Sequence, residues 1–234
     1  MKTKHFGASL MLATLFLAGC QMDEMMVAEA PPTDEPVTVT AAVEGDAPVA
    51  AADEPAADPV YYSARADGKR TIPAVDVADF HPALLRNEVE FASSEMPGTI
   101  VIDTKGPFLY LVQPEGKALR YGIAIGREGF GWEGTGTIAR TAQWPTWTPP
   151  PEMIKREPHL EEWRGGMPGG VSNPLGARAL YIYFGDRDSG YRIHGTNQPN
   201  SIGWAASSGC FRMINQDVID LYERVERGAK VVVL

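Results

Sequence analysis

Residues 99–112 have the sequence TIVIDTKGPFLYLV, and this stretch decides the fold class. The segment from Thr99 to Asp103 is rich in β-branched residues, and the segment from Phe108 to Val112 is apolar and aromatic. Gly106 lies in the short link between them. Two such segments joined by a turn containing glycine predict a β-hairpin. The domain around the hairpin is therefore expected to be built mainly from strands.

Further strands are predicted downstream of the hairpin, at Arg120–Gly126, Ala179–Phe184, Tyr191–His194 and Val231–Leu234, the last of which would close the sheet. The Gly-, Pro- and Trp-rich stretch 129–176 shows no regular pattern. Residues 218–227 predict a helix, with Asn215 or Asp217 as its cap and Gly228 as its stop. The expected fold is mainly β, a sandwich or open barrel with one or two short helices. A domain over residues 97–234 is large enough to bury its own core.

The segments before this domain differ from it in composition. Residues 61–96 form an N-terminal extension, for which we expect a short helix within 75–86 and a strand over 88–91. Residues 20–60 are acidic, rich in Ala and Pro, and lack aromatic residues up to Val60. Such a segment buries too little apolar area to offset the entropy of ordering, so we expect a disordered tether. An extended tether of this length reaches on the order of 100 Å.

Residues 1–19 have the pattern of an export signal, with Lys2 and Lys4 followed by a short apolar run. The run is too short to cross a membrane, which needs roughly 20 residues. It ends in Leu-Ala-Gly before Cys20, which resembles the lipobox of bacterial lipoproteins. The resemblance implies a lipid on Cys20, a membrane anchor and a periplasmic location. Gln21 favours the outer over the inner membrane by the same resemblance. The alternative is an ordinary signal peptide with a chance cysteine.

The negative charge is concentrated in the N-terminal part of the chain. The whole chain has a formal net charge of −9, of which residues 1–96 contribute −10. Residues 97–234 are therefore close to neutral and contain no run of basic residues. This distribution predicts a solvated acidic tail and gives no indication of nucleic-acid binding.

Cys210 is the residue with the clearest chemical signal. A lipid on Cys20 would leave this thiol without a disulfide partner in an oxidising compartment. The thiol follows Gly209 in a tight turn, in which the amides of Ser208, Gly209 and Cys210 could form an oxyanion hole. His194 ends a predicted strand 16 residues upstream and could act as the base. A Cys–His pair is expected to lower the thiol pKa. The alternative is a buried, inert cysteine.

Arg212 lies two residues beyond Cys210, so an extended segment would point both side chains to the same side. There the guanidinium could bind a substrate carboxylate. A structural salt bridge beneath the site is the alternative role.

The motifs Tyr-Arg-Ile-His-Gly-Thr at 191–196 and Ser-Ser-Gly-Cys-Phe-Arg-Met at 207–213 resemble the L,D-transpeptidase catalytic domain (YkuD) family. The segment Asn173-Pro174-Leu175-Gly176 and the opening hairpin resemble the same family, so the resemblance covers about 97–234. Many members have histidine where this chain has Ser208. The loop between His194 and Ser207 is also somewhat short.

The resemblance implies a cysteine acyltransferase that needs no metal or cofactor. Cys210 would attack a tetrapeptide stem of peptidoglycan and expel D-alanine, and an amine would then resolve the thioester into a 3→3 cross-link. The carbonyl of Gly195 would orient the His194 imidazole. We expect the substrate to bind near Arg212, Thr196, Ser207 and Trp204. The resemblance also implies inhibition by carbapenems.

Several outcomes stay open at the level of sequence. The acyl group could pass to a stem peptide, to an outer-membrane protein, to a D-amino acid or to water. A non-catalytic lipoprotein that binds the cell wall is a different class of function. Four tryptophans could line a substrate groove or serve packing alone: Trp144, Trp147, Trp163 and Trp204. His159 is expected to be solvated, and His81 shows no functional signal.

Overall fold

The computed structural model describes residues 58–127 and 131–234. The predicted signal peptide, Cys20 and the tether up to residue 57 lie outside the described residues. Within the described ranges, no helix is both long and apolar enough to cross a membrane.

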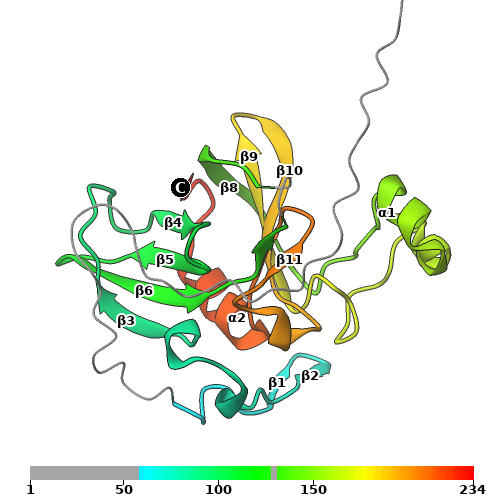
Figure 1. The fold of residues 1–234 in the computed structure, drawn as a ribbon, viewed down its shortest axis with the longest axis horizontal. Helices are drawn as coiled ribbons and strands as arrows, with labels where there is room; N and C mark the ends of the chain where they lie inside the picture. The colour runs from blue at the N-terminus through cyan, green and yellow to red at the C-terminus, as the bar shows by residue number, and fades with distance from the viewer. Residues whose placement is uncertain (1–57, 128–130) are drawn as a thin grey trace, which may run out of the picture. The chain divides into compact units, whose positions relative to one another are not determined.

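A mixed nine-stranded sheet forms the framework and confirms the mainly β class (Figure 1). Its strand order is β12-β10-β9-β8-β13-β4-β5-β6-β3. In chain order these strands are β3 (Asn87–Glu90), β4 (Ile100–Asp103), β5 (Phe108–Val112), β6 (Lys117–Gly122), β8 (Gly134–Gln143), β9 (Arg178–Phe184), β10 (Arg187–His194), β12 (Phe211–Arg212) and β13 (Lys230–Val233).

The predicted hairpin is confirmed as β4 and β5, which pair antiparallel with Ile100 opposite Leu111. Asp103 closes its turn, because its carboxylate accepts hydrogen bonds from the amides of Lys105 and Gly106 at 2.9 and 3.0 Å. Both faces of the hairpin are buried. The continuous apolar runs that predicted it therefore reflect a central position in the sheet.

Two strand predictions need correction. The segment 120–126 is not one strand, because it ends as β6 at Gly122 and resumes as β7 (Ile125–Gly126), which pairs with β11 (Ala205–Ser207) in a separate two-stranded sheet. The segment 231–234 does not close the sheet. Its residues up to Val233 belong to β13, which lies between β8 and β4 and pairs with both.

The predicted late helix is α2 (Asn215–Arg224), three residues earlier than expected at both ends. Its N-cap is Ile214, so neither Asn215 nor Asp217 caps it. The side chain of Asn215 is used elsewhere, as described below. The helix buries Val218 and Leu221 in the core beside the sheet.

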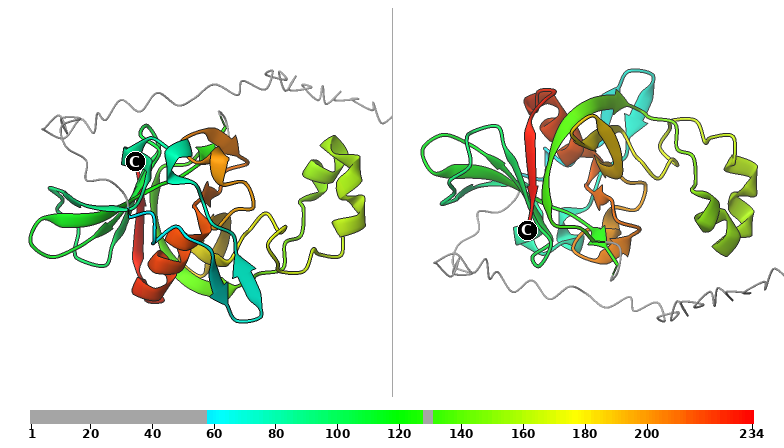
Figure 2. Two further views of the ribbon diagram at one scale, coloured as in Figure 1. Left: turned by 90° about the horizontal axis from the view of Figure 1, so that it is seen from below. Right: turned by 90° about the horizontal axis from the view of Figure 1, so that it is seen from above.

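The Gly/Pro/Trp-rich stretch contains elements that its composition did not predict. Strand β8 lies there, followed by α1 (Pro151–Arg156) and the 3-10 helix η3 (Pro158–Trp163). We call residues 145–168 the arm. It projects away from the sheet in both views of Figure 2. Its base is closed by two hydrogen bonds between Trp147 and Met167, at 2.9 and 2.7 Å. The amide of Asn173 donates to the carbonyls of residues 145, 167 and 168 at 3.1 Å each.

The N-terminal extension, residues 61–96, packs on the same sheet. It contains the hairpin β1 (Arg65–Asp67) and β2 (Arg70–Ile72), the 3-10 turns η1 (Val77–Asp79) and η2 (Pro82–Leu84), and the edge strand β3. The single helix expected within 75–86 is thus replaced by two short turns, because His81 and Pro82 start a new turn there. The strand expected at 88–91 is present as β3.

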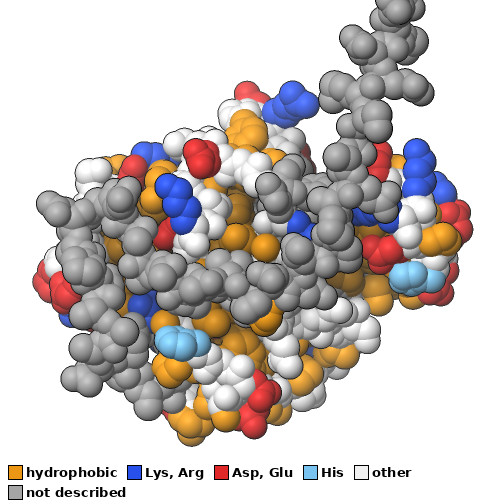
Figure 3. Space-filling view, viewed as in Figure 1, with side chains coloured by type: hydrophobic (Ala, Val, Ile, Leu, Met, Phe, Trp, Pro, Cys, Tyr) orange, Lys and Arg blue, Asp and Glu red, His pale blue; other side chains and the backbone are white. Residues whose placement is uncertain are grey.

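On the face shown in Figure 3, the acidic and basic side chains that remain visible are interspersed. This pattern agrees with the nearly neutral charge of residues 97–234.

Candidate active site

Cys210 lies in the turn between β11 and β12 and is a free thiol. Ser207 builds this turn: its hydroxyl donates to the carbonyl of Cys210 at 2.5 Å and accepts from the amide of Gly209 at 3.1 Å. Gly209 has φ +105°, in the region that favours glycine. After the turn, β12 pairs in parallel with β10, which sets Arg212 opposite His194. The sheet therefore brings together the two motifs that the sequence separates.

One cavity of about 900 Å³ contains most of the predicted site residues. His194, Cys210 and Arg212 line it, together with Ser207, Ser208 and Trp204. Gly195, Thr196 and Gly209 do not line the cavity. Thr196 is buried, and its hydroxyl accepts from the amide of Gln198 at 2.9 Å. Its placement fits support of the turn after His194 rather than contact with substrate.

The imidazole of His194 is 4% exposed and is held by the residue that follows it. Its Nδ1 lies 2.6 Å from the carbonyl oxygen of Gly195. Because a carbonyl only accepts, Nδ1 carries the proton and Nε2 is left as the basic nitrogen. Burial lowers the pKa of His194 to about 4, and the nearby charges of Arg212 and Arg192 act in the same direction. The imidazole is therefore neutral near pH 7 and able to accept a proton.

Burial raises the pKa of the Cys210 thiol. A backbone hydrogen bond from Arg192 and the charges of Arg192 and Arg212 oppose this rise without reversing it. The thiol Sγ lies 4.0 Å from the carbonyl oxygen of Gly190, at the limit of a weak hydrogen bond from a protonated thiol. The expected lowering of the thiol pKa is therefore not found, because the pKa is shifted upward. The thiol and the imidazole, which line the same cavity, are both neutral at rest near pH 7.

The three amides predicted as an oxyanion hole are not equivalent. The amide of Gly209 is engaged by Ser207, so it is not free to bind an oxyanion in this conformation. Within residues 58–127 and 131–234, no acceptor pairs with the amides of Ser208 and Cys210. These two amides are the better candidates.

Arg212 has no acidic partner in the part of the chain that the structure describes. Its closest polar contact is a long one, 3.5 Å from Nη1 to the side-chain oxygen of Gln198. Burial lowers the pKa of this guanidinium, and the proximity of Cys210 opposes that effect. A half-buried cation at a cavity wall, with no counter-ion in residues 58–127 or 131–234, fits the binding of a carboxylate better than a structural salt bridge.

Asn215 connects the turn after His194 to the start of β9, and sequence reasoning missed this role. Its amide nitrogen donates to the carbonyl of Thr196 at 2.7 Å, and its amide oxygen accepts from the amide of Ala177 at 2.9 Å. A Cβ added to Gly195 or Gly176 would lie 2.2 or 2.3 Å from the same amide oxygen. Both glycines are therefore required by close approach. The glycines were visible in the motifs, whereas Asn215 was interpreted as a helix cap.

The tryptophans divide into two groups. Trp147 and Trp163 of the arm line the cavity with Trp204. Trp144 does not, because its indole donates to the carboxylate of Asp67 at 2.7 Å. The side chain of His159 is 72% exposed, as expected, although it also borders the cavity. Arg127 is a further cavity residue that the sequence did not indicate.

No group of three or more His, Cys, Asp or Glu side chains is placed to hold a metal ion among the described residues.

Comparison with known proteins gives matches over the same part of the chain. Residues 97–233 match the family model of the L,D-transpeptidase catalytic domain, YkuD. Probable L,D-transpeptidase ErfK/SrfK of Escherichia coli (strain K12) is 33% identical over 144 residues, which are 58% of this chain and 43% of that protein. Probable L,D-transpeptidase YbiS of the same strain is 38% identical over 103 residues, 42% of this chain and 30% of that protein. The chain thus matches less than half the length of these relatives.

A crystal structure from Brucella melitensis, named a probable carnitine operon oxidoreductase, is 50% identical. The match covers 68% of this chain and 99% of that chain, with a TM-score of 0.47.

Proposed function

Because this chain belongs to the L,D-transpeptidase catalytic domain family, we propose that it is a cysteine acyltransferase acting on the stem peptides of peptidoglycan. The observation that carries the proposal is the cavity shared by Cys210 and His194. In it, the Gly195 carbonyl fixes the imidazole in the tautomer that leaves Nε2 as a base.

In the first half-reaction, His194 takes the proton of Cys210 as the sulfur attacks the carbonyl of diaminopimelate in a tetrapeptide stem. A carbon–sulfur bond forms, and the amide bond to D-alanine breaks. The imidazolium returns its proton to the leaving amine, so D-alanine departs as a neutral amine. The amides of Ser208 and Cys210 are the proposed donors to the oxyanion.

In the second half-reaction, an amine attacks the thioester. Its carbon–nitrogen bond forms, the carbon–sulfur bond breaks, and the amine proton returns through His194 to the sulfur. With a diaminopimelate side chain as the amine, the product is a 3→3 cross-link. An amine of an outer-membrane protein, a D-amino acid or water would give attachment, exchange or hydrolysis by the same steps. Arg212, with no carboxylate partner among the described residues, is proposed to bind a carboxylate of the stem.

The test is incubation of the purified protein with tetrapeptide muropeptides, analysed by mass spectrometry. We expect release of D-alanine and formation of 3→3 dimers, and loss of both products by at least about 1,000-fold in Cys210→Ala, which removes the nucleophile. Release of D-alanine without dimers would assign hydrolysis. If wild type releases no D-alanine and a carbapenem forms no adduct at Cys210, the enzyme proposal fails and the wall-binding alternative stands.

We further propose that the protein is a periplasmic lipoprotein, with residues 1–19 removed and a lipid on Cys20. The basic start, the apolar run and the Leu-Ala-Gly-Cys sequence support this proposal. Labelling cells with an alkyne fatty acid should mark the wild-type protein and leave Cys20→Ser unmarked. Equal labelling of Cys210→Ala would show that the active-site thiol is not the acylated one. An unlabelled wild type in the soluble periplasmic fraction would favour an ordinary signal peptide.

A further inference from the structure

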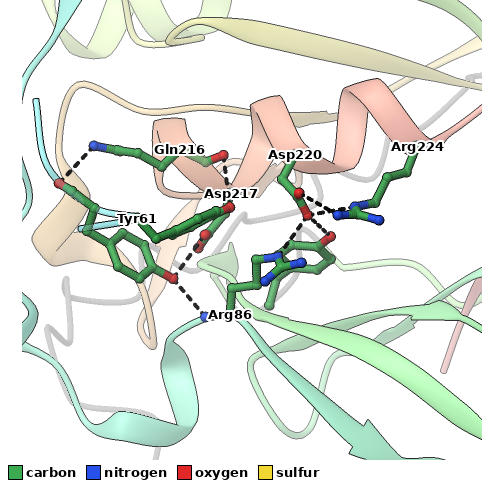
Figure 4. A network of polar contacts seen from close by, with 8 residues as sticks. Tyr61, Arg86, Gln216, Asp217, Asp220 and Arg224 are labelled. Carbon is green, nitrogen blue, oxygen red and sulfur yellow. Dashed lines mark hydrogen bonds and ion pairs between the residues drawn. The ribbon is translucent and has the colours of Figure 1, made fainter. Parts of the chain in front are cut away.

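The N-terminal extension lies outside residues 97–233, which match the family model, yet it is joined to the active site by buried polar contacts. Three consecutive residues of the first turn of α2 carry these contacts. Asn215 bonds to the active-site turn. Gln216 and Asp217 bind the extension (Figure 4).

Gln216 is fully buried, and its amide nitrogen donates to backbone carbonyls of the extension. The distances are 3.2 Å to Tyr62 and 3.0 Å to Pro73. The next residue, Asp217, accepts a hydrogen bond from the Tyr62 hydroxyl at 3.0 Å. The same hydroxyl accepts from the amide of Arg86 at 2.7 Å. Because Tyr62, Gln216 and Asp217 are buried, their polar groups cannot exchange these partners for water without a substantial cost.

A second set of contacts reaches the start of β9. Asp67 forms a two-pronged ion pair with Arg178, at 2.7 and 2.9 Å. The guanidinium side chain is only 5% exposed, and this pairing holds the pKa of the Asp67 carboxyl below its usual value. Ile72 of β2 packs in a small core with Ala177 and Ile219. The extension thus contacts Ala177, just before β9, and Arg178, the first residue of β9.

The residues held by the extension are the ones that hold the turn after His194. The Arg178 carbonyl accepts from the amide of Gly195 at 3.0 Å. Asn215 links the amide of Ala177 to the carbonyl of Thr196. Gly195 in turn supplies the carbonyl that fixes the His194 imidazole. Two continuous chains of contacts therefore run from the extension to the base.

We propose that the N-terminal extension is a brace for the active site, in which Gln216 and Asp67 are positioning residues that act on His194 through Asn215 and Arg178. The inference rests on the proposed role of His194 as the base. A shift of about 1 Å in the position of a catalytic base lowers the reaction rate on the order of 100-fold. A brace that does not touch the substrate can therefore still control turnover. It would act on the chemical step and leave substrate binding in the cavity nearly unchanged.

The test uses the whole chain with Gln216→Met, which keeps side-chain length but removes the buried donor, and Asp67→Asn, which removes the charge facing Arg178. We expect kcat for D-alanine release to fall about 10- to 100-fold while KM stays within about twofold. The pKa of His194, followed by NMR of the imidazole, should move away from about 4, because both the burial that lowers it and the Gly195 hydrogen bond that opposes this lowering depend on the position of the turn.

Lys117→Ala is the matched control, because it breaks the exposed Lys117–Glu88 ion pair that joins β6 to the edge strand of the extension. It touches neither α2 nor β9, so kcat and the His194 pKa should stay at wild-type values. If Gln216→Met does not fold, Tyr62→Phe removes only the hydroxyl between Arg86 and Asp217 and should shift both quantities in the same direction.

Folded variants with unchanged kcat and unchanged His194 pKa would overturn the brace. So would a loss of activity that only follows the loss of folded protein, with the His194 pKa constant. The NMR measurement needs no substrate. A shift of the His194 pKa in a protein without turnover would therefore support the brace while rejecting the proposed function.

Discussion

At the scale of residues, the two reacting side chains are uncharged at rest. Burial is the first cause of both shifts, since it disfavours the thiolate of Cys210 and the imidazolium of His194 alike. A thiolate–imidazolium pair formed in advance is disfavoured, because both pKa shifts favour the neutral forms. The nucleophile is therefore expected to form only as the proton moves, when the bound substrate is in place.

This arrangement predicts the pH dependence of turnover. Because the pKa of His194 is lowered to about 4, its basic form persists as pH falls below 6.5. The acid limb of kcat/KM should therefore have an apparent pKa near 4 rather than near 6.5. Alkylation of Cys210 by iodoacetamide should still be accelerating above pH 9, because the thiol pKa is raised from its ordinary value of 9.0. An acid limb near 6.5 would contradict a buried, neutral imidazole.

At the scale of elements, the site depends on where three segments meet. The end of β10, the start of β9 and the first turn of α2 converge on the side-chain amide of Asn215. Two glycines make this approach possible, and Gly176 also has φ +61°. Gly195 lies in the motif at 191–196 and Gly176 in the segment 173–176, so these two family-like segments together form one junction around Asn215.

The junction predicts a strong effect of Gly195→Ala. The new Cβ would lie 2.2 Å from the Asn215 amide oxygen and 3.0 Å from the Ala177 nitrogen, so the turn after His194 must move. We expect a loss of about 1–3 kcal/mol in the free energy of unfolding, as for other overpacked sites. Turnover should fall at least about 10-fold.

Gly98→Ala is the control for this substitution, because Gly98 has φ +89° and no atom within 4 Å of the added Cβ. It should cost about 1 kcal/mol of backbone strain and leave turnover intact. Equal effects of the two variants on turnover would show that the junction does not position the base.

At the scale of the whole molecule, the parts of the fold that could be predicted are those encoded by continuous apolar runs or by a motif with closely spaced functional residues. The hairpin β4–β5 and the pairing of the Cys210 and His194 motifs could be predicted. Strand β8 could not, because it is Gly-rich and Ile138 is its only fully buried large apolar residue. A Cβ on Gly136 would lie 2.7 Å from the side chain of Ile182, so packing requires glycine at this position. The same glycine weakens the hydrophobic pattern by which a strand is predicted.

The parts of the fold that are held by polar contacts could not be predicted from the sequence either. Strands β1 and β2 contain three charged side chains, and they stabilise the fold through single contacts such as Asp67 with Arg178. A pattern of hydrophobicity cannot show such a pairing across more than a hundred residues. The arm was missed for a related reason, since its base is fixed by the buried amide of Asn173 rather than by an apolar stripe.

The position of β13 has a consequence for how the active site comes into being. This strand joins β4 to β8, with Val231 opposite Ile100 and Gly136, and so unites the two halves of the sheet. Contacts between segments so distant in sequence close slowly, on the scale of milliseconds to seconds. Cys210 lies at the seam, because Arg212 exchanges hydrogen bonds with Ala124 of the other half. We therefore expect that Cys210 and its base are brought into one site only when the two halves of the sheet have joined.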